Sequence, residues 1–278
     1  MRLLRGELRK LVKRPASRIT LILQLAIILI IYLSVAASFK ALADNASTPN
    51  AEQSRVGIKL LLTFPGAYAG VIGLITGLGG LLAIGYGASA AGADWGWGMV
   101  KVAIARGESR SRYILAKLVA VLLLIGLGVL ISFVVGVVAA VVAAAVAGIS
   151  LSGVSDSSVV STLPEQLLRG WWGIAEEATI GFAIATFARS QLAGLGAGIA
   201  LYFVEQFSTL FLPDVVRYLP FHVASSALRV TTSVAGNGNG ASLIPPLDPN
   251  FALLLVTIYL LVAAAAAALI VERAEITG

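Results

Sequence analysis

The chain has no cysteine and a single histidine, His222, among its 278 residues. Without cysteine there is no disulfide, thiolate metal ligand or cysteine nucleophile, and one histidine is too few for a multi-histidine metal site. We expect His222 to be an ordinary surface residue of a loop. The sequence also lacks a Gly-Lys dipeptide and a His-Glu-x-x-His run, which excludes a P-loop of the usual form and a common zinc motif. We therefore expect no enzymatic activity, metal or cofactor in this chain itself.

Charge is also scarce. Only 12% of the residues are charged and 58% are hydrophobic, whereas a soluble domain has roughly 25% charged residues. The net charge of +6 would fit nucleic acid, but the cations lie beside apolar runs, as the positive-inside rule requires. The composition therefore predicts an integral membrane protein that contacts membrane lipid and does not bind nucleic acid.

Six apolar runs are predicted to cross the membrane as helices, because about 20 residues at ~1.5 Å each span roughly 30 Å of hydrocarbon. The predicted fold is an all-α integral membrane protein with one transmembrane domain over residues 1–278. Both termini are predicted to be cytoplasmic, since 14 of the 20 lysines and arginines then lie on the inside. The six runs are residues 19–39, 60–91, 113–149, 167–188, 192–212 and 251–271.

Residues 1–18 are predicted to form an amphipathic helix in the membrane interface. Leu4, Leu8 and Leu11 repeat at helical spacing among basic residues, and Pro15 is expected to end the helix. The alternative is a plain basic flank that only orients the first span. Ala41-Leu42-Ala43 resembles a signal cleavage site, but the preceding run exceeds the roughly 7–15 residues of such signals, which favours an uncleaved span.

The connections differ in polarity. Residues 40–59 are polar and are expected to be an outer loop, as are residues 150–165. Residues 213–250 are expected to be an external segment, and their half-apolar middle leaves a re-entrant path open. The segment 92–112 belongs to a basic island that cannot lie in hydrocarbon. Gly107 divides this island into two short helical pieces, and such a helix at the membrane surface is well placed to receive a push from a soluble partner.

Two further groups of residues are candidates for function. Gly66, Gly70, Gly73 and Gly77 have small-xxx-small spacing, which suits close helix packing at a subunit interface or pore, or packing within one bundle. Three carboxylates, Glu176, Glu177 and Glu205, fall inside predicted spans, where charge is costly without a cavity or partner. They predict a polar patch along a translocation path. The alternatives are a structural network with Arg169 or Arg217, or an interface position.

The order of these features resembles the membrane subunit of ABC exporters of the class that handles drugs, lipids and polysaccharides. The resemblance rests on RPASR at residues 14–18, a glycine-rich second span, WGWGMVKVAIARGESRSRYILAKLVA from Trp95, and FARSQLAGLGAG from Phe187. Within the island it covers Asp94, Gly98, Lys101, Arg106, Gly107 and Arg110, together with Tyr113 and Lys117. Met99 departs from the family's small polar residue.

The resemblance implies a permease in a bacterial plasma membrane that pairs with a second permease, identical or related, and with two cytoplasmic ATPase subunits. Those subunits would hold the ATP and Mg²⁺. The resemblance also implies that Asp94 to Ala105 is a coupling helix that docks on the ATPase, and that the segment before the last span forms an external gate. A secondary carrier that uses Glu176, Glu177 and Glu205 as an ion relay is the competing class. A non-transporting membrane scaffold is a third interpretation.

Overall fold

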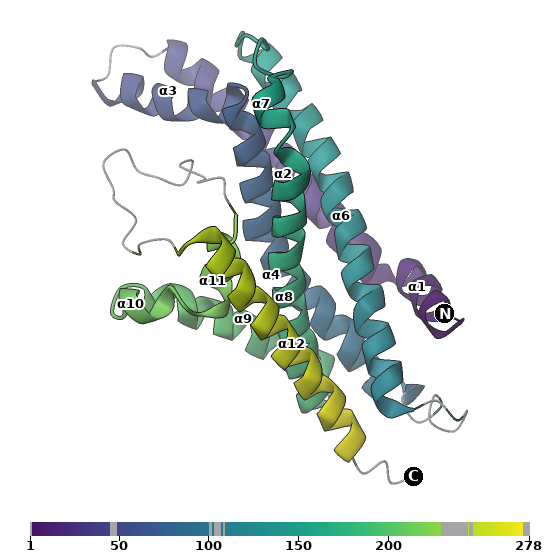
Figure 1. Cartoon of the computed structure of the whole chain (residues 1–278). Coiled ribbons are helices and arrows are strands. Elements are labelled where there is room, and N and C mark those ends of the chain that lie inside the picture. The colour runs from purple at the N-terminus through teal and green to yellow at the C-terminus, as the bar shows by residue number, and fades with distance from the viewer. Residues whose placement is uncertain are drawn as a thin grey trace.

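The computed structural model describes residues 2–44, 49–99, 102, 107, 109–228, 244 and 247–274. Every regular element in that part of the chain is an α-helix, which confirms the all-α prediction. Figure 1 shows a bundle in which α4 (Gly66–Gly96) and α8 (Leu163–Ala188) run together, with α6 (Arg110–Val146) and α12 (Pro249–Arg273) beside them.

In the part of the chain that the structure describes, four helices are long and apolar enough to cross a membrane: α2 (Pro15–Asp44), α4, α6 and α12. On α2 and α6 large apolar side chains point outward, including Ile22, Leu33 and Leu130. Exposed apolar faces on long helices suit lipid rather than water. The chain is therefore an all-helical membrane protein. Because α6 has 37 residues, it measures about 55 Å at ~1.5 Å per residue and extends beyond the hydrocarbon.

The other two predicted spans correspond to α8 and α9 (Gln191–Ser208). Among the described helices, α8 and α9 are not long and apolar enough to count as membrane spans by composition. In α8, Glu176 and Glu177 interrupt the apolar sequence near its middle. Yet α8 is the central helix, in contact with α4, α6, α9, α11 and α12. Its polar groups are thus enclosed by protein rather than by lipid.

Small residues bring α4, α8 and α9 together. A Cβ on Gly87 would collide with the backbone of Ala178, and one on Gly181 would collide with the backbone of Ile84. Gly170 faces Thr76 near one end of the pair, and Gly92 faces Gln191 at the other. Along these contacts the residue numbers of α4 and α8 rise together, so the two helices run in the same direction where they pack.

The N-terminal residues form α1 (Arg2–Lys13), a separate amphipathic helix. Leu4, Leu8 and Leu11 pack against α6 and against Tyr86 and Ala90 of α4. The helix ends before Pro15, which is the first residue of α2. The predicted amphipathic helix is thus present, while its place at a membrane surface stays a prediction.

The expected outer loop at residues 40–59 is wrong. Helix α2 continues to Asp44, and α3 (Pro49–Leu62) follows as a helix of its own. Pro49 suits a first helical position because proline has no N–H to leave unpaired there. The break falls instead at residues 63–65, so the second span begins at Gly66 rather than Leu60.

The segment before the last helix is also partly ordered into helices. After α7 (Ser157–Val160) and the α8–α9 pair come α10 (Pro213–Val216) and α11 (Pro220–Ser226). Val223 and Ala224 of α11, together with Ala227, pack against Ala252 and Val256 of α12. Ala224 also meets Gly173 of α8, so this segment folds back onto the bundle well below the start of α8.

Candidate functional site

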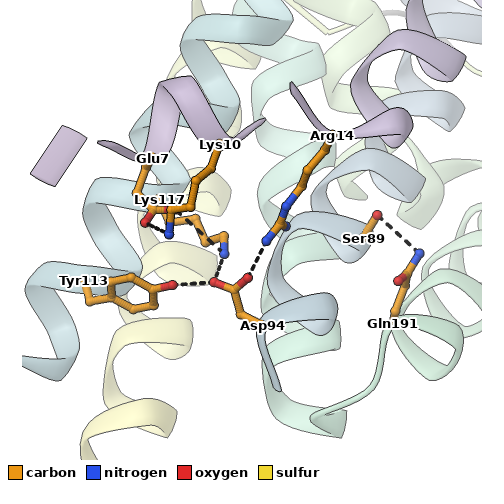
Figure 2. Close-up of polar contacts among 8 residues, drawn as sticks. All are labelled: Glu7, Lys10, Arg14, Ser89, Asp94, Tyr113, Lys117 and Gln191. Atoms are coloured by element: carbon orange, nitrogen blue, oxygen red, sulfur yellow. Dashed lines mark hydrogen bonds and ion pairs between the residues drawn. The ribbon is translucent and has the colours of Figure 1, made fainter. Parts of the chain in front are cut away.

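A buried cluster of charged residues joins three helices at the end of the bundle where α4 ends and α6 begins (Figure 2). We call this group the Asp94 cluster. It comprises Glu7 and Lys10 of α1, Arg14 between α1 and α2, Asp94 of α4, and Tyr113 and Lys117 of α6.

Asp94 is the centre of the cluster and is only 1% exposed. Arg14 Nη2 donates to Asp94 Oδ1 at 2.6 Å, and the Tyr113 hydroxyl and Lys117 Nζ both donate to Oδ2. Each carboxylate oxygen therefore has a charged partner. Such charge-assisted bonds are among the stronger hydrogen bonds in proteins.

Lys117 is fully buried and lies between two acids. Besides Asp94, its Nζ lies 3.9 Å from Glu7 Oε2, and Glu7 also pairs with Lys10 on α1. An isolated charge here would be expensive, because desolvation costs several kcal/mol per ion, about what a good partner returns. The cluster therefore makes the positions of α1, α4 and α6 depend on one another.

Aromatic residues extend the connection. The guanidinium of Arg14 lies 5.0 Å from the Trp97 ring centroid, and that of Arg189 lies 5.2 Å from the Trp95 ring. The nearby Ser89 Oγ accepts from Gln191 Nε2 at 3.2 Å, as Figure 2 shows. The α8–α9 turn is thus fixed to the end of α4, beside the Asp94 cluster.

The local backbone suits this turn. Arg189 adopts a left-handed conformation at the end of α8, and the Ser190 hydroxyl accepts from Ala193 N at 3.3 Å as the N-cap of α9. The end of α8 and the capped start of α9 are therefore joined by only two residues, Arg189 and Ser190. This is the FARSQLAGLGAG segment on which part of the resemblance rests.

The island residues have different outcomes. Gly98 and Gly107 adopt positive φ values of 64° and 81°, which favour glycine, so both mark changes of chain direction. Lys101 and Arg106 lie outside the described residues. The predicted coupling helix does not begin at Asp94, because residues 94–96 are the last residues of α4 and a turn follows at Trp97 and Gly98. Arg110 Nη1 donates to the carbonyls of Glu272 (3.2 Å) and Ala274 (2.7 Å) and so closes the end of α12.

Sequence reasoning missed the role of Glu7 and the pairing of Arg14 with Asp94. The motifs behind the resemblance contain Arg14, Tyr113 and Lys117, but the motifs did not indicate which residues these side chains contact. One signal was present: Glu7 is the only acidic residue among the first 18, next to seven cations. A lone acid in a basic amphipathic helix indicates a specific partner.

The three predicted intramembrane carboxylates are all buried. Glu176 is 0%, Glu177 6% and Glu205 2% exposed. Neither oxygen of Glu176, nor Oε2 of Glu177, has a hydrogen-bond partner among the described residues. Glu177 instead lies against Gly80 of α4, where any Cβ would collide with its carboxylate. Such unpaired buried groups are rare in proteins.

Glu205 is different because it has a partner. Its Oε1 accepts from the backbone N–H of His222 at 2.7 Å and lies 2.9 Å from His222 Nδ1. The expectation that His222 is an ordinary surface residue is therefore wrong. The fold brings α11 back against α9, and this contact could not be read from a chain separation of 17 residues.

The proposed partners of these acids are engaged elsewhere. Arg169 Nε pairs with Glu165 at 2.9 Å, and its other nitrogens donate to the carbonyls of Ala227 and Pro249 and to the Asn250 side chain. Arg217 donates to the Tyr218 hydroxyl. Arg169 therefore joins α8 to the start of α12 rather than neutralising Glu176 or Glu177.

The glycines of the second span serve packing within the chain where the structure describes their surroundings. A Cβ on Gly70 would lie 3.2 Å from the Tyr32 hydroxyl of α2, and one on Gly66 would lie 2.9 Å from the Leu60 carbonyl oxygen. A Cβ on Gly77 would meet nothing within 4 Å. A role of Gly66, Gly70, Gly73 and Gly77 in a subunit interface or pore stays a prediction.

Across the described part of the chain, no group of three or more His, Asp or Glu side chains is arranged to hold a metal ion. A family model described as a protein of unknown function (DUF2705) matches residues 78–277, from the middle of α4 to beyond α12. No curated protein matches the chain.

Proposed function

The chain belongs to the DUF2705 family of proteins of unknown function, and we propose that it is the transmembrane subunit of an ATP-driven ABC exporter. It would form the translocation path while separate cytoplasmic ATPase subunits, which hold ATP and Mg²⁺, supply the energy. The proposal starts from the resemblance of the island and its flanking motifs, and it includes a second permease subunit and a bacterial plasma membrane.

The observation that carries the proposal is the Asp94 cluster. The basic island, Asp94 to Lys117, connects the end of α4 to the start of α6. Asp94 at one end is bonded to Arg14, directly after α1, and Lys117 at the other end pairs with Asp94 and with Glu7 of α1. A displacement of the island would therefore move α1, α4 and α6 together. Transmission of a push from a soluble partner requires this kind of connection, which a passive loop does not need.

The proposed topology has six spans with both termini in the cytoplasm. It adds α8 and α9 to the four helices of sufficient apolar length. Two contacts support this: α8 runs beside α4 in the same direction from Gly170 to the turn at Gln191, and α9 returns along α8 with Gly194 against Ala185. The folded-back α10 and α11 would then lie on the outer side, as a gate.

The test is co-purification of ATPase activity from native membranes. We compare the wild type with a Lys101→Glu/Arg106→Glu variant, in which the island loses two cations. The matched control is Lys40→Glu/Lys59→Glu, two exposed cations in the α2–α3 region. We expect ATPase activity with the wild type and control and its loss with the island variant. Absence of any ATPase under several mild conditions would overturn the proposal.

One observation favours an alternative, an ion-coupled secondary carrier. Glu176 and Glu177 are buried, and three of their oxygens have no hydrogen-bond partner within the described part of the chain. Intramembrane acids commonly mark ion or proton paths. If transport persists without an ATPase, depends on an ion gradient, and is lost in Glu177→Gln at normal protein level, the carrier is correct.

A further inference from the structure

A cavity of about 300 Å³ lies between the start of α2 and the middles of α4 and α6, with Ile174 of α8 also in its lining. Its walls are almost entirely apolar, formed by residues such as Ile75, Ala83 and Ile131. At its rim Val12, Arg18 and Leu127 are exposed, so the cavity opens on the outer surface between α2 and α6. The volume is at the small end of the roughly 300–1,000 Å³ of ligand pockets.

One polar side chain in this apolar wall has no partner. Gln24 of α2 is 7% exposed, and neither its Oε1 nor its Nε2 has a hydrogen-bond partner among the described residues. A buried amide without a partner costs roughly 1–3 kcal/mol, so such groups are normally paired. Gln24 lines the cavity, and a molecule inside it could pair with both amide atoms.

The mouth of the cavity is basic. Arg18 lines it and is exposed, and α1 presents Arg5, Arg9 and Lys13 on its exposed face nearby. The first 18 residues hold seven cations against the single acid Glu7, which is itself buried in the Asp94 cluster. An anionic headgroup is therefore complementary to this end of the molecule.

We propose that this cavity binds one anionic phospholipid. An acyl chain occupies the apolar walls, glycerol-ester oxygens pair with Gln24, and the phosphate lies at Arg18. Arg18 and Gln24 are separated by about 9 Å along α2 at ~1.5 Å per residue. Both side chains are long enough to reach the headgroup region of one lipid. The site goes beyond the proposed function and does not depend on it, because the chain needs no ATPase to bind a lipid.

The test is native mass spectrometry of the detergent-purified chain with phosphatidylglycerol and, separately, phosphatidylcholine. We expect the wild type to bind phosphatidylglycerol about tenfold more tightly, because both lipids carry the phosphate but the choline ammonium of phosphatidylcholine is repelled by the basic mouth. Arg18→Gln should remove this preference, whereas Lys59→Gln, an exposed cation of α3 that does not line the cavity, should retain it. Equal binding of both lipids by the wild type would overturn the anionic site.

Two variants test the cavity itself. A Cβ on Gly128 meets nothing within 4 Å, and Gly128 lines the cavity, so we expect the leucine in Gly128→Leu to occupy part of the cavity without a clash at its Cβ. Its control is Gly77→Leu, another open position that does not line the cavity. We expect at least fivefold weaker phosphatidylglycerol binding in Gly128→Leu and Gln24→Leu, and none of this loss in the control. Unchanged binding in Gln24→Leu contradicts the proposal, including when Gly128→Leu fails to fold.

Discussion

At the scale of single residues, the Asp94 cluster is where burial and charge conflict most. Asp94 and Lys117 are almost completely buried, and the Arg14 side chain is 14% exposed. Removing one partner of a buried pair leaves an uncompensated charge, whereas removing both leaves none. The energetic role of the cluster can therefore be separated from ordinary packing by comparing single and double variants.

We predict that Asp94→Asn lowers the free energy of unfolding by about 3–5 kcal/mol, because Arg14 and Lys117 lose their shared counter-charge. Lys117→Met added to that variant should recover about 0.5–3 kcal/mol as a coupling energy. Chaotrope unfolding in detergent, followed by tryptophan fluorescence, measures both. Lys10→Met is the control: its side chain is 37% exposed, so we expect a loss below about 1 kcal/mol. Additive effects of the Asp94 and Lys117 variants would show that the two residues are not coupled.

The sequence was informative about which residues matter here but not about what they contact. Asp94 and Arg110 were predicted as coupling residues because the island that contains them resembles the coupling segment of ABC permeases. That Asp94 pairs with Arg14, 80 positions away, and that Arg110 closes the end of α12, depends on how the helices are arranged. Neither composition nor helical periodicity predicts how the helices are arranged relative to one another.

At the scale of helices, the contact between α4 and α8 depends on the absence of side chains. Gly87 lies against the backbone of Ala178 and Gly181 against that of Ile84. Close approach of backbones replaces the hydrophobic driving force that helices lack in lipid. A methyl group at either position has no flexible neighbour to displace, so the two helices themselves would have to separate.

We predict opposite signs for two chemically identical substitutions in α4. Gly87→Ala should lower the midpoint of thermal unfolding in detergent, since overpacking costs typically about 1–3 kcal/mol. Gly77→Ala should leave the midpoint unchanged or raise it, because its Cβ meets nothing and alanine is the better helix former by roughly 0.5–1 kcal/mol. A rise of equal size in both variants would mean that helix propensity, rather than the α4–α8 contact, decides the effect.

The helices themselves were predictable where apolar length was the signal, and not where it was absent. The runs behind α2, α6 and α12 were found to within a few residues at most ends. By contrast, α3 was taken for a loop because its polar sequence indicated exposure, and exposure says nothing about helicity. The spacing of Gly66, Gly70, Gly73 and Gly77 indicated close helix packing, but the glycines at the α4–α8 contact are Gly87 and Gly181, and Gly77 meets nothing within 4 Å.

At the scale of the whole molecule, the number of membrane crossings depends on α8 and α9. Their charges interrupt the apolar pattern, yet Glu176 and Glu177 are enclosed by α4 and other helices. A hydropathy value is calculated from the sequence of one helix alone. It does not include the neighbouring helix that covers a polar face in the fold. The sequence predicted the two crossings from the apolar runs 167–188 and 192–212, supported by the distribution of positive charge, and the contacts with α4 are consistent with the proposed crossings.

The position that distinguishes six crossings from four is the α8–α9 turn. With six, Ala188 is cytoplasmic like Gly96 at the end of α4; with four, it lies outside with Ser152. Because the chain has no cysteine of its own, a cysteine at each of these exposed positions can be labelled without background. We predict that an impermeant maleimide labels Ser152→Cys in intact spheroplasts, and labels Gly96→Cys and Ala188→Cys only after permeabilisation. Labelling of Ala188→Cys in intact spheroplasts would instead mean that α8 and α9 do not cross, and the proposed translocation path between them would have no membrane to traverse.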